Sequence, residues 1–269
     1  MMIGMCRPFY GKSPTANEMN AEGSPGSPGT GLSESGLTSD AIPVRHFFGT
    51  RHAPLGLNAH IQLGQVTRGH PEFPFIVTLK QIHSTRVVVL NTPRGPGTLE
   101  QTEGDVLVTN QPQTLIVVRT ADCVPVLLFE KATGVVGAIH AGWRGTVDGI
   151  VSETIRTCVE EFGANAEQMH FAIGPSIGPC CYEVDEPVIG PLRSRYPAWP
   201  GVLRQTTEGK GVLDLKQLIH HQIRACGIPD DQIGRLDHCT HCRADLFYSY
   251  RREGQVIGTM FSGIMLPAA

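Results

Sequence analysis

Three residues with metal-binding side chains stand at the edges of apolar stretches. Cys123 lies in Arg119-Thr-Ala-Asp-Cys-Val-Pro-Val126, and His140 follows it with C-x16-H spacing in Ala138-Ile-His-Ala-Gly-Trp-Arg-Gly145. A third donor, His83, lies upstream in Lys80-Gln-Ile-His-Ser84. Two imidazoles and one thiolate match a three-ligand zinc site whose fourth position is left for water or substrate. This pattern is typical of a catalytic centre and makes an enzyme the leading interpretation.

Taken singly, the same residues also fit structural roles. A free cysteine beside valines is usually a small buried hydrophobe, and a histidine that ends an apolar strand is often a hydrogen-bonded core residue. The neighbouring residues favour a functional site, because Asp122 and Arg144 place charged side chains in the same loops, and a hydrophobic core would exclude such charges.

The segment after His140 predicts an oxyanion site. Two glycines bracket Arg144, and a helix predicted to begin with Thr146 as its N-cap would offer free N–H groups and a positive dipole end. Arg144 adds a planar two-pronged donor suited to phosphate or carboxylate. A surface ion pair of Arg144 with Asp148 or Glu153 is an equally open interpretation.

Three further clusters have weaker chemical signals. His238-Cys-Thr-His-Cys242 contains a CxxC, but no second pair completes a zinc knuckle, and the preferred interpretation is structural. His70-Pro-Glu72 mimics the H-x-E of zinc base deaminases without their P-C-x-x-C partner, which indicates a loop. Cys180-Cys181 follows a Gly/Pro-rich loop and is expected to line a pocket or to pack.

Composition narrows the class of protein. The 269 residues can bury one sizeable core, and a net charge of -3 with 17% charged residues gives no sign of nucleic-acid or membrane-surface binding. No run approaches the roughly 18 apolar residues of a membrane span. Because Arg7, Pro8 and Lys12 interrupt the first residues, a secretory signal is not expected there. Eight cysteines in such a chain point to thiols or ligands rather than a disulfide scaffold, so a reducing cytoplasmic setting is expected.

The chain divides into an extension and one catalytic domain. Residues 1–41 are expected to be disordered, because this Ser/Pro/Gly-rich stretch cannot bury enough apolar surface to offset its ordering entropy. The folded domain is expected over residues 42–269. Its apolar runs predict strands, with the fifth and sixth forming a hairpin, at residues 75–79, 86–90, 105–109, 115–118, 124–129 and 135–140.

Helical periodicity predicts two helices, at residues 146–162 and 213–226. Gly227 and Pro229 would close the second helix. The C-terminus reads as a hairpin of residues 246–251 and 256–266 around Glu253-Gly254. Paired strands with two clear helices predict an α+β, or mixed α/β, fold.

Five motifs in this chain resemble the laccase-domain (YfiH-type) family, whose members were first described as multicopper polyphenol oxidases and later as purine nucleoside phosphorylases. The motifs occur in family order: Gln81-Ile-His83, Thr120-Ala-Asp-Cys-Val-Pro125, His140-Ala-Gly-Trp-Arg-Gly145, Ile173-Gly-Pro-Ser-Ile-Gly-Pro-Cys-Cys-Tyr-Glu-Val184 and Phe247-Tyr-Ser-Tyr-Arg-Arg252. The resemblance implies two packed mixed β-sheets with helices outside.

The resemblance also implies a zinc site and a purine chemistry. By it the zinc ligands are His83, Cys123 and His140, and the substrates are purine nucleosides (adenosine, inosine, guanosine, methylthioadenosine) and phosphate, with adenosine deamination as a second activity. Arg144 and Arg51 are expected to hold phosphate, and Asp122 to shuttle a proton or support the ligands. The family's usual Gly-Gly loop is replaced here, although Arg51 is kept.

Three other functions stay open at this stage. A cysteine hydrolase or amidase would use Cys123 as nucleophile and His140 as base. Editing of peptidoglycan precursors by cleavage of muramyl–amino acid intermediates is a related activity of some bacterial relatives. A multicopper oxidase is disfavoured, because none of the eleven histidines forms a His-x-His pair.

Overall fold

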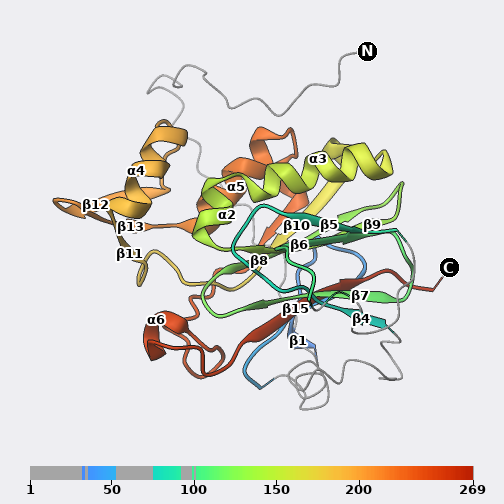
Figure 1. The fold of residues 1–269 in the computed structure, drawn as a ribbon, viewed down its shortest axis with the longest axis horizontal. Helices are drawn as coiled ribbons and strands as arrows, with labels where there is room; N and C mark the ends of the chain where they lie inside the picture. Colours follow the sequence, from blue (N-terminus) through green and yellow to red (C-terminus); the bar gives the residue numbers. More distant parts are fainter. Residues whose placement is uncertain (1–31, 34–35, 53–74, 92–98, 100, 269) are drawn as a thin grey trace.

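The computed structural model describes residues 32–33, 36–52, 75–91, 99 and 101–268. Two six-stranded sheets form its centre (Figure 1). The first sheet has the order β1-β2-β3-β15-β7-β4, with bounds β1 Leu32–Ser33, β2 Gly36–Leu37, β3 Arg45–Phe48, β15 Met260–Met265, β7 Thr114–Thr120 and β4 Phe75–Val77. The second has the order β14-β10-β8-β9-β6-β5, with bounds β14 Ile233–Arg235, β10 Met169–Ile173, β8 Val124–Glu130, β9 Val135–Ala141, β6 Val106–Thr109 and β5 Val87–Leu90.

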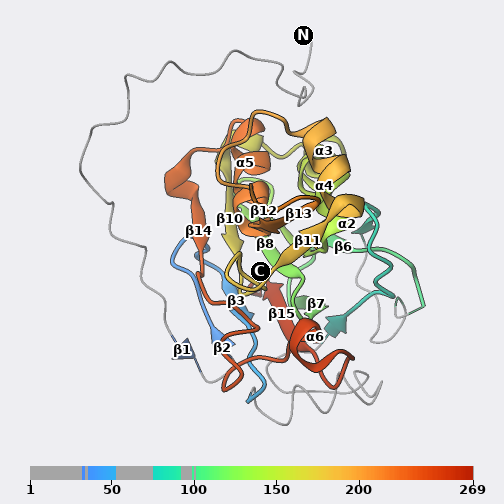
Figure 2. The same cartoon turned by 90° about the vertical axis from the view of Figure 1, so that its left-hand side faces the viewer.

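The helices cover the outer face of the second sheet, as two views at right angles show (Figures 1 and 2). The covering helices are α2 Trp143–Val147, α3 Ile150–Phe162 and α5 Leu215–Ala225. A further short helix, α6 Tyr250–Glu253, lies away from them on the opposite side of the sheets. Helix α4, Glu186–Arg195, packs beside a three-stranded sheet of β11 Glu183–Asp185, β13 Lys210–Leu213 and β12 Leu203–Thr207. Short 3-10 turns, η1 Ala166–Gln168 and η2 Asp230–Gln232, precede β10 and β14.

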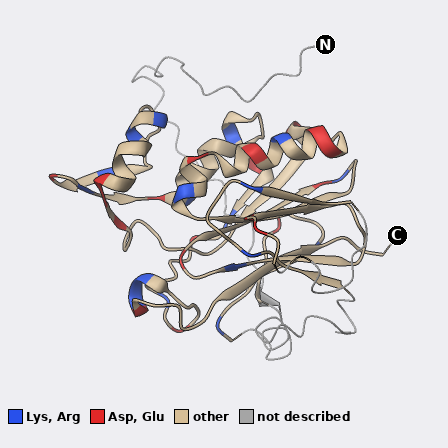
Figure 3. Ribbon diagram, in the orientation of Figure 1, with Lys and Arg blue, Asp and Glu red and all other residues tan. Residues whose placement is uncertain are grey.

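Side-chain alternation explains why the central strands read as continuous apolar runs. In β8, Val126 and Leu128 face the helices, whereas Leu127 and Phe129 face the first sheet. A strand buried on both faces gains apolar contacts at every position, so period two disappears from its sequence. The polar surface lies elsewhere: charged residues of both signs are interspersed along the helices, whereas the central strands carry few (Figure 3).

The mixed α/β class with packed mixed sheets is confirmed. Each large sheet contains parallel pairs, such as β5 with β6, beside antiparallel ones, and the predicted β8–β9 hairpin is present. The small third sheet is an addition, because residues 203–213 show no clear strand signal in the sequence. None of the helices in the described part of the chain is long and apolar enough to cross a bilayer.

The expected boundary at Ile42 lies inside ordered structure. Leu37 of β2 pairs with Phe48 of β3, and the Ser39 N–H donates to His46 Nε2 at 3.0 Å. The described fold therefore includes residues before Ile42. Residues 1–31, for which disorder is expected, and the His70-Pro-Glu72 loop lie outside the described residues.

The first predicted helix is wrong in its start. Thr146 is not an N-cap: it lies inside α2, and its hydroxyl donates to the Gly142 carbonyl at 2.9 Å. The chain then breaks at Gly149, which has φ 88° and precedes α3. The left-handed conformation of Gly149 interrupts the helix, and apolar periodicity alone does not reveal such a break. The second helix is confirmed as α5, with Asp214 as its N-cap.

The predicted C-terminal hairpin is wrong. Ser249 instead caps the short helix α6 by accepting from the Arg252 N–H, and β15 pairs with β3 and β7 rather than with residues 246–251. Strands distant in the sequence, and not the neighbouring residues 246–251, are thus the pairing partners of β15. Arg252 of α6 holds the loop that precedes this helix by donating to the carbonyls of Thr240, His241 and Phe247.

The tight packing between the two sheets predicts that a side chain at Gly174, which follows β10, would destabilise the fold. A Cβ there would lie 2.2 Å from Cδ1 of the fully buried Phe48 and 2.8 Å from Cγ of Pro125. We expect Gly174→Ala to lower the free energy of unfolding by about 1–3 kcal/mol through overpacking, as measured by urea denaturation. Val256→Ala, at a residue 64% exposed, should change it by less than about 0.5 kcal/mol. Equal stabilities of the wild type and Gly174→Ala would contradict this packing.

Candidate metal centre

The three predicted metal ligands converge at one place. The donor atoms of His83, Cys123 and His140 all lie within 4.8 Å of one another. Cys123 Sγ is 3.9 Å from His83 Nε2, and the two imidazole rings meet edge to face with centroids 4.8 Å apart. His140 is buried, Cys123 half-buried and His83 exposed, so the group opens to solvent on the His83 side.

The β8–β9 hairpin explains why the C-x16-H spacing brings two ligands together. Its last pairs join Pro125 to His140 and Val124 to Ala141, which leaves Cys123 just beyond the end of the ladder. The loop before β5 supplies His83 from the other side. Two loops and the strand β9 therefore supply the three ligands, and the β8–β9 register sets the separation of Cys123 and His140.

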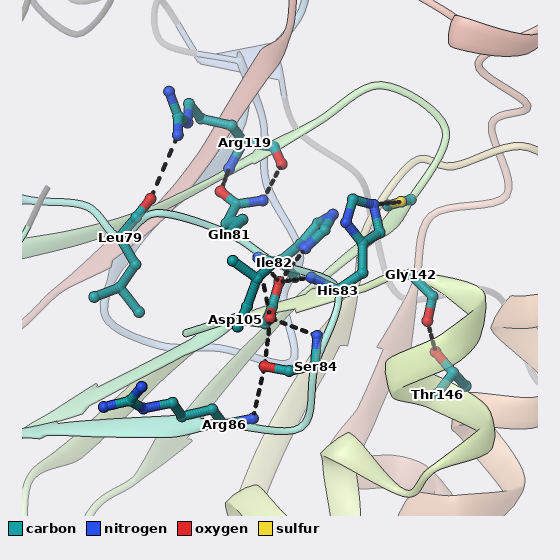
Figure 4. Close-up of polar contacts among 12 residues, drawn as sticks. Leu79, Gln81, Ile82, His83, Ser84, Arg86, Asp105, Arg119, Gly142 and Thr146 are labelled. Atoms are coloured by element: carbon teal, nitrogen blue, oxygen red, sulfur yellow. Dashed lines mark hydrogen bonds and ion pairs between the residues drawn. The ribbon is translucent and has the colours of Figure 1, made fainter. Parts of the chain in front are cut away.

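Asp105 is the organising residue, and the sequence interpretation missed it. Its fully buried carboxylate accepts from His140 Nδ1 at 2.8 Å, from the N–H groups of His83 and Ser84 at 2.9 and 2.6 Å, and from the Ser84 hydroxyl at 2.7 Å. Figure 4 shows this carboxylate with its bonds to the 82–84 loop. The bond to Nδ1 fixes that proton and leaves Nε2 of His140 for a metal, an arrangement common to metal-binding histidines.

The same carboxylate supports an unusual backbone at His83, which has φ 61°. A non-glycine residue rarely adopts this left-handed conformation, at a cost of about 1–3 kcal/mol, unless neighbouring structure maintains it. The bonds from the 82–84 N–H groups to Asp105 supply that support. They turn His83 toward Cys123.

The two glycines around Arg144 allow protein segments, rather than a ligand, to approach closely. A Cβ on Gly142 would lie 2.9 Å from His83 Cδ2 and 3.3 Å from Cys123 Sγ, and one on Gly145 would lie 2.7 Å from the Ser84 carbonyl oxygen. The His-Ala-Gly-Trp-Arg-Gly motif therefore places the helix turn directly against the three candidate ligands.

Charges in the group favour an ionised thiol. Burial opposes ionisation of Cys123, but His140 and His83 outweigh it and lower the pKa of the thiol to about 6. Burial likewise opposes protonation of His140, but Cys123 and Asp105 raise its pKa to about 9. Burial would raise the pKa of Asp105, yet its bonds from His140 and Ser84 lower it to about 2. A thiolate and an anionic hydrogen-bond partner are thus both present at neutral pH.

This donor set fits zinc by its own chemistry. One thiolate, two imidazoles and a carboxylate behind one imidazole correspond to a three-ligand zinc site with an open fourth position. Among the described residues, only this group and a second one of four cysteines gather three or more metal-binding side chains.

Asp122 has an anchoring position. Its carboxylate accepts from the Thr240 hydroxyl at 2.6 Å, from the Ser249 hydroxyl at 3.0 Å and from the Arg251 N–H at 2.7 Å. It also has φ 85° directly before Cys123. These bonds occupy both carboxylate oxygens, so the geometry favours support of the Cys123 loop over proton shuttling.

The two predicted arginines have different surroundings. Arg144 is exposed, and its guanidinium stacks on the Trp143 ring, 4.5 Å from its centroid. The expected competitors for it bind elsewhere, since Asp148 pairs with Arg195 and Glu153 with Arg156. Arg51 donates to the Ala244 carbonyl and lies 4.8 Å over the Tyr248 ring, which ties it to the loop before α6.

Two residues without a predicted role also lie near the centre. Burial raises the pKa of Tyr182 to about 12, and the charge of Cys123 acts in the same direction, so the phenol stays protonated. The Arg251 guanidinium lies 5.2 Å over the Tyr182 ring. Both residues belong to motifs noted above, but only the folded chain brings them together.

Sequence comparison relates this chain to a family of known proteins. Residues 60–267 match the family described as multi-copper polyphenol oxidoreductase laccase. The chain belongs to this family. A relative named purine nucleoside phosphorylase, from Bacteroides thetaiotaomicron, is 40% identical over a match that covers 60% of this chain and 60% of that protein's length. A relative named adenosine deaminase RL5, from an unknown prokaryotic organism, is 33% identical over 70% of this chain and 74% of its own length.

The fold agrees with the family assignment. The crystal structure of the Bacillus licheniformis hypothetical protein YfiH superposes with a TM-score of 0.77 and 27% identity, covering 88% of this chain and 98% of that one. The family's copper-based description contrasts with the donor set found here, which holds three ligands rather than the many histidines of a multicopper centre.

The position of Asp105 behind His140 predicts its effect on metal binding. We expect Asp105→Asn to weaken zinc affinity about 10–100-fold, because the amide cannot accept all the bonds that orient His140 and the 82–84 loop. Competition with a chromophoric chelator would measure this. Glu103→Gln, two residues away and paired at the surface with Lys80, is the control and should leave affinity unchanged. Equal affinities for both variants would contradict the role of Asp105.

The acidity of Cys123 predicts its reactivity in metal-free protein. The folded-state pKa is lowered to about 6, so the thiolate persists above that pH and is lost as the pH falls through it. Alkylation of Cys123 by iodoacetamide, followed by peptide mass spectrometry, should therefore reach half its maximal rate near pH 6. Partial desolvation and hydrogen bonds with the Cys239 and Cys242 thiols raise the pKa of Cys180 to about 11, so Cys180 should react only at more alkaline pH. Identical pH profiles for the two cysteines would refute the assignment, and added zinc should protect Cys123.

Proposed function

We propose that this protein is a zinc-dependent purine nucleoside phosphorylase that also deaminates adenosine. The observation that carries the proposal is the convergence of His83, Cys123 and His140, with Nδ1 of His140 held by Asp105. The names of the two relatives support the purine chemistry. The substrates would be phosphate and nucleosides such as adenosine, inosine, guanosine and methylthioadenosine.

The three ligands would hold zinc through Nε2 of His140, a nitrogen of His83 and the Cys123 thiolate. When bound, zinc supplies Lewis acidity beside the substrate. Asp105 keeps His140 oriented throughout the reaction, so no ligand has to reorganise as charge develops. His83, the exposed ligand, lies on the side from which a substrate enters.

Arg144 is our candidate for phosphate binding. Its guanidinium carbon lies over the Trp143 ring, 4.5 Å from the centroid, and it has no carboxylate partner among the described residues. A planar donor held by stacking loses little freedom when it binds an oxyanion through two hydrogen bonds. Arg51, tied to the loop before α6, is proposed as a more distant contributor, and Asp122 as a positioning residue for Cys123.

Phosphorolysis and deamination attack different bonds of adenosine. In the first, a phosphate oxygen bonds to the anomeric carbon as the glycosidic bond breaks, giving adenine and ribose 1-phosphate. In the second, water adds to C6 and ammonia leaves, giving inosine. The protonated phenol of Tyr182 could donate a hydrogen bond to either leaving group, and this role is proposed together with that of Arg144.

A cysteine hydrolase is the second candidate, and one observation favours it. Cys123, His140 and Asp105 form a thiolate–imidazole–carboxylate series like that of cysteine amidases. The convergence of His83 on the same point favours the metal, because a nucleophilic cysteine needs no second imidazole. A covalent acyl adduct on Cys123 would support the hydrolase instead.

The setting proposed for this activity is the cytoplasm. A reducing compartment preserves the thiols of six cysteines in the described part of the chain, namely Cys123, Cys158, Cys180, Cys181, Cys239 and Cys242. Zinc and phosphate, with a nucleoside, are the partners that the proposal requires.

The direct test is product analysis with adenosine. Zinc-loaded protein should convert adenosine to adenine and ribose 1-phosphate when phosphate is present, and to inosine when it is absent. We expect Cys123→Ala to lose zinc at this centre and turnover together, by at least about 10²-fold in rate, because the thiolate supplies one of three ligands. Chromatography of the products and metal analysis measure both effects, with Cys226→Ser as a control.

Two results would contradict the proposal. Full activity in a Cys123→Ala variant that binds no zinc at this centre would remove the metal from the mechanism. No turnover of any purine nucleoside by zinc-loaded wild type would favour the amide-cleaving alternative.

A further inference from the structure

Four cysteine thiols gather outside the centre described above. Cys180 and Cys181 lie in the turn before β11, and Cys239 and Cys242 form the CxxC of the loop after β14. Their Sγ atoms all lie within 4.8 Å of one another. The sequence predicts a structural role for the CxxC and a pocket-lining or packing role for Cys180-Cys181, and some sixty residues divide the two pairs along the chain.

The sulfur spacing fits one metal ion. Cys242 Sγ lies 3.6 Å from Cys180 Sγ and 3.3 Å from Cys181 Sγ. Four sulfurs around a tetrahedral zinc ion at about 2.3 Å would be separated by about 3.8 Å. A disulfide would require about 2.05 Å between two of them.

Backbone donors add to this arrangement. The Gly178 N–H donates to Cys239 Sγ at 3.2 Å, a bond that favours the thiolate. Two further N–H groups, of Cys181 and Tyr182, donate to the Gly178 carbonyl at 3.0 Å each and fold the turn that carries Cys180 and Cys181. The turn thereby presents adjacent thiols to the same point.

We propose that Cys180, Cys181, Cys239 and Cys242 bind a second zinc ion in a structural tetrathiolate site. Four soft thiolate donors select zinc over harder divalent ions, and they leave no coordination position for a substrate. The ion would neutralise thiolates that otherwise repel one another at the surface, where Cys180 and Cys242 are exposed.

The site would fix the loops that surround Cys123. Thr240, inside the CxxC, donates to the Asp122 carboxylate at 2.6 Å, and the Ile177 N–H donates to the Asp122 carbonyl at 3.1 Å. Ser176 also forms a backbone bridge with Cys239. Both cysteine-bearing segments therefore contact the residue next to Cys123, and a zinc ion joining them would hold that residue in its left-handed conformation.

Metal counting on the full chain tests the proposal. Wild-type protein loaded with zinc and freed of excess ion should contain two equivalents by mass spectrometry of the metal. Cys123→Ala should retain one equivalent and Cys242→Ser should retain one. Cys226→Ser, a cysteine variant outside both groups, should retain two.

Cobalt substitution of the Cys123→Ala variant identifies the ligands without altering the four cysteines. Cys123→Ala loaded with one equivalent of cobalt should show the intense sulfur-to-metal charge-transfer absorption of four thiolates, and Cys242→Ser should show the weaker band of the single thiolate at Cys123. The spectrum of Cys123→Ala does not depend on whether the Cys242 variant folds.

The outcomes separate this proposal from the proposed function. One equivalent in wild type that survives Cys123→Ala and disappears in Cys242→Ser would support the tetrathiolate site and contradict the catalytic one. Cobalt-loaded Cys123→Ala without thiolate absorption would overturn the tetrathiolate site. An intact mass lower by two hydrogens for a Cys180–Cys242 or Cys181–Cys242 disulfide in freshly purified protein would also overturn it.

Discussion

The buried carboxylate of Asp105 is the constraint on which the site depends. A charge fully removed from water is costly unless hydrogen bonds replace its solvation, and here His140, Ser84 and the 82–84 backbone provide them. Those donors can meet at one carboxylate only if the 82–84 loop folds back over β6 and β9. The requirement to satisfy one anion therefore places two candidate metal-binding histidines side by side.

A second carboxylate performs a parallel task on the other side of Cys123. Asp122 joins the Cys123 loop to the CxxC loop and to the start of α6 through Thr240, Ser249 and Arg251. Both carboxylates lie beside backbone in the left-handed region, at His83 and at Asp122 itself. Such strain near ligands fits a centre whose geometry is preorganised. The four cysteines add a further constraint on the same loops.

Sequence could predict the parts of this protein that depend on local pattern. Continuous apolar runs predicted the central strands, and the C-x16-H spacing followed from the β8–β9 hairpin, so Cys123 and His140 were found together. Asp105 escaped because a carboxylate at the start of a buried strand looks like an ordinary strand boundary until its partners, twenty or more residues away, are known. The break at Gly149 and the pairing of β15 escaped because backbone conformation and long-range contacts decided them.

A crystal structure of the zinc-loaded protein, with anomalous diffraction at the zinc absorption edge, would locate the metal and its ligands. We expect an anomalous peak between His140 Nε2, Cys123 Sγ and His83, with Asp105 still bonded to Nδ1 of His140. Its fourth coordination position should be free of protein ligands. Absence of a peak there in protein that turns over adenosine, or a zinc ion bound without His140, would contradict the proposed zinc centre.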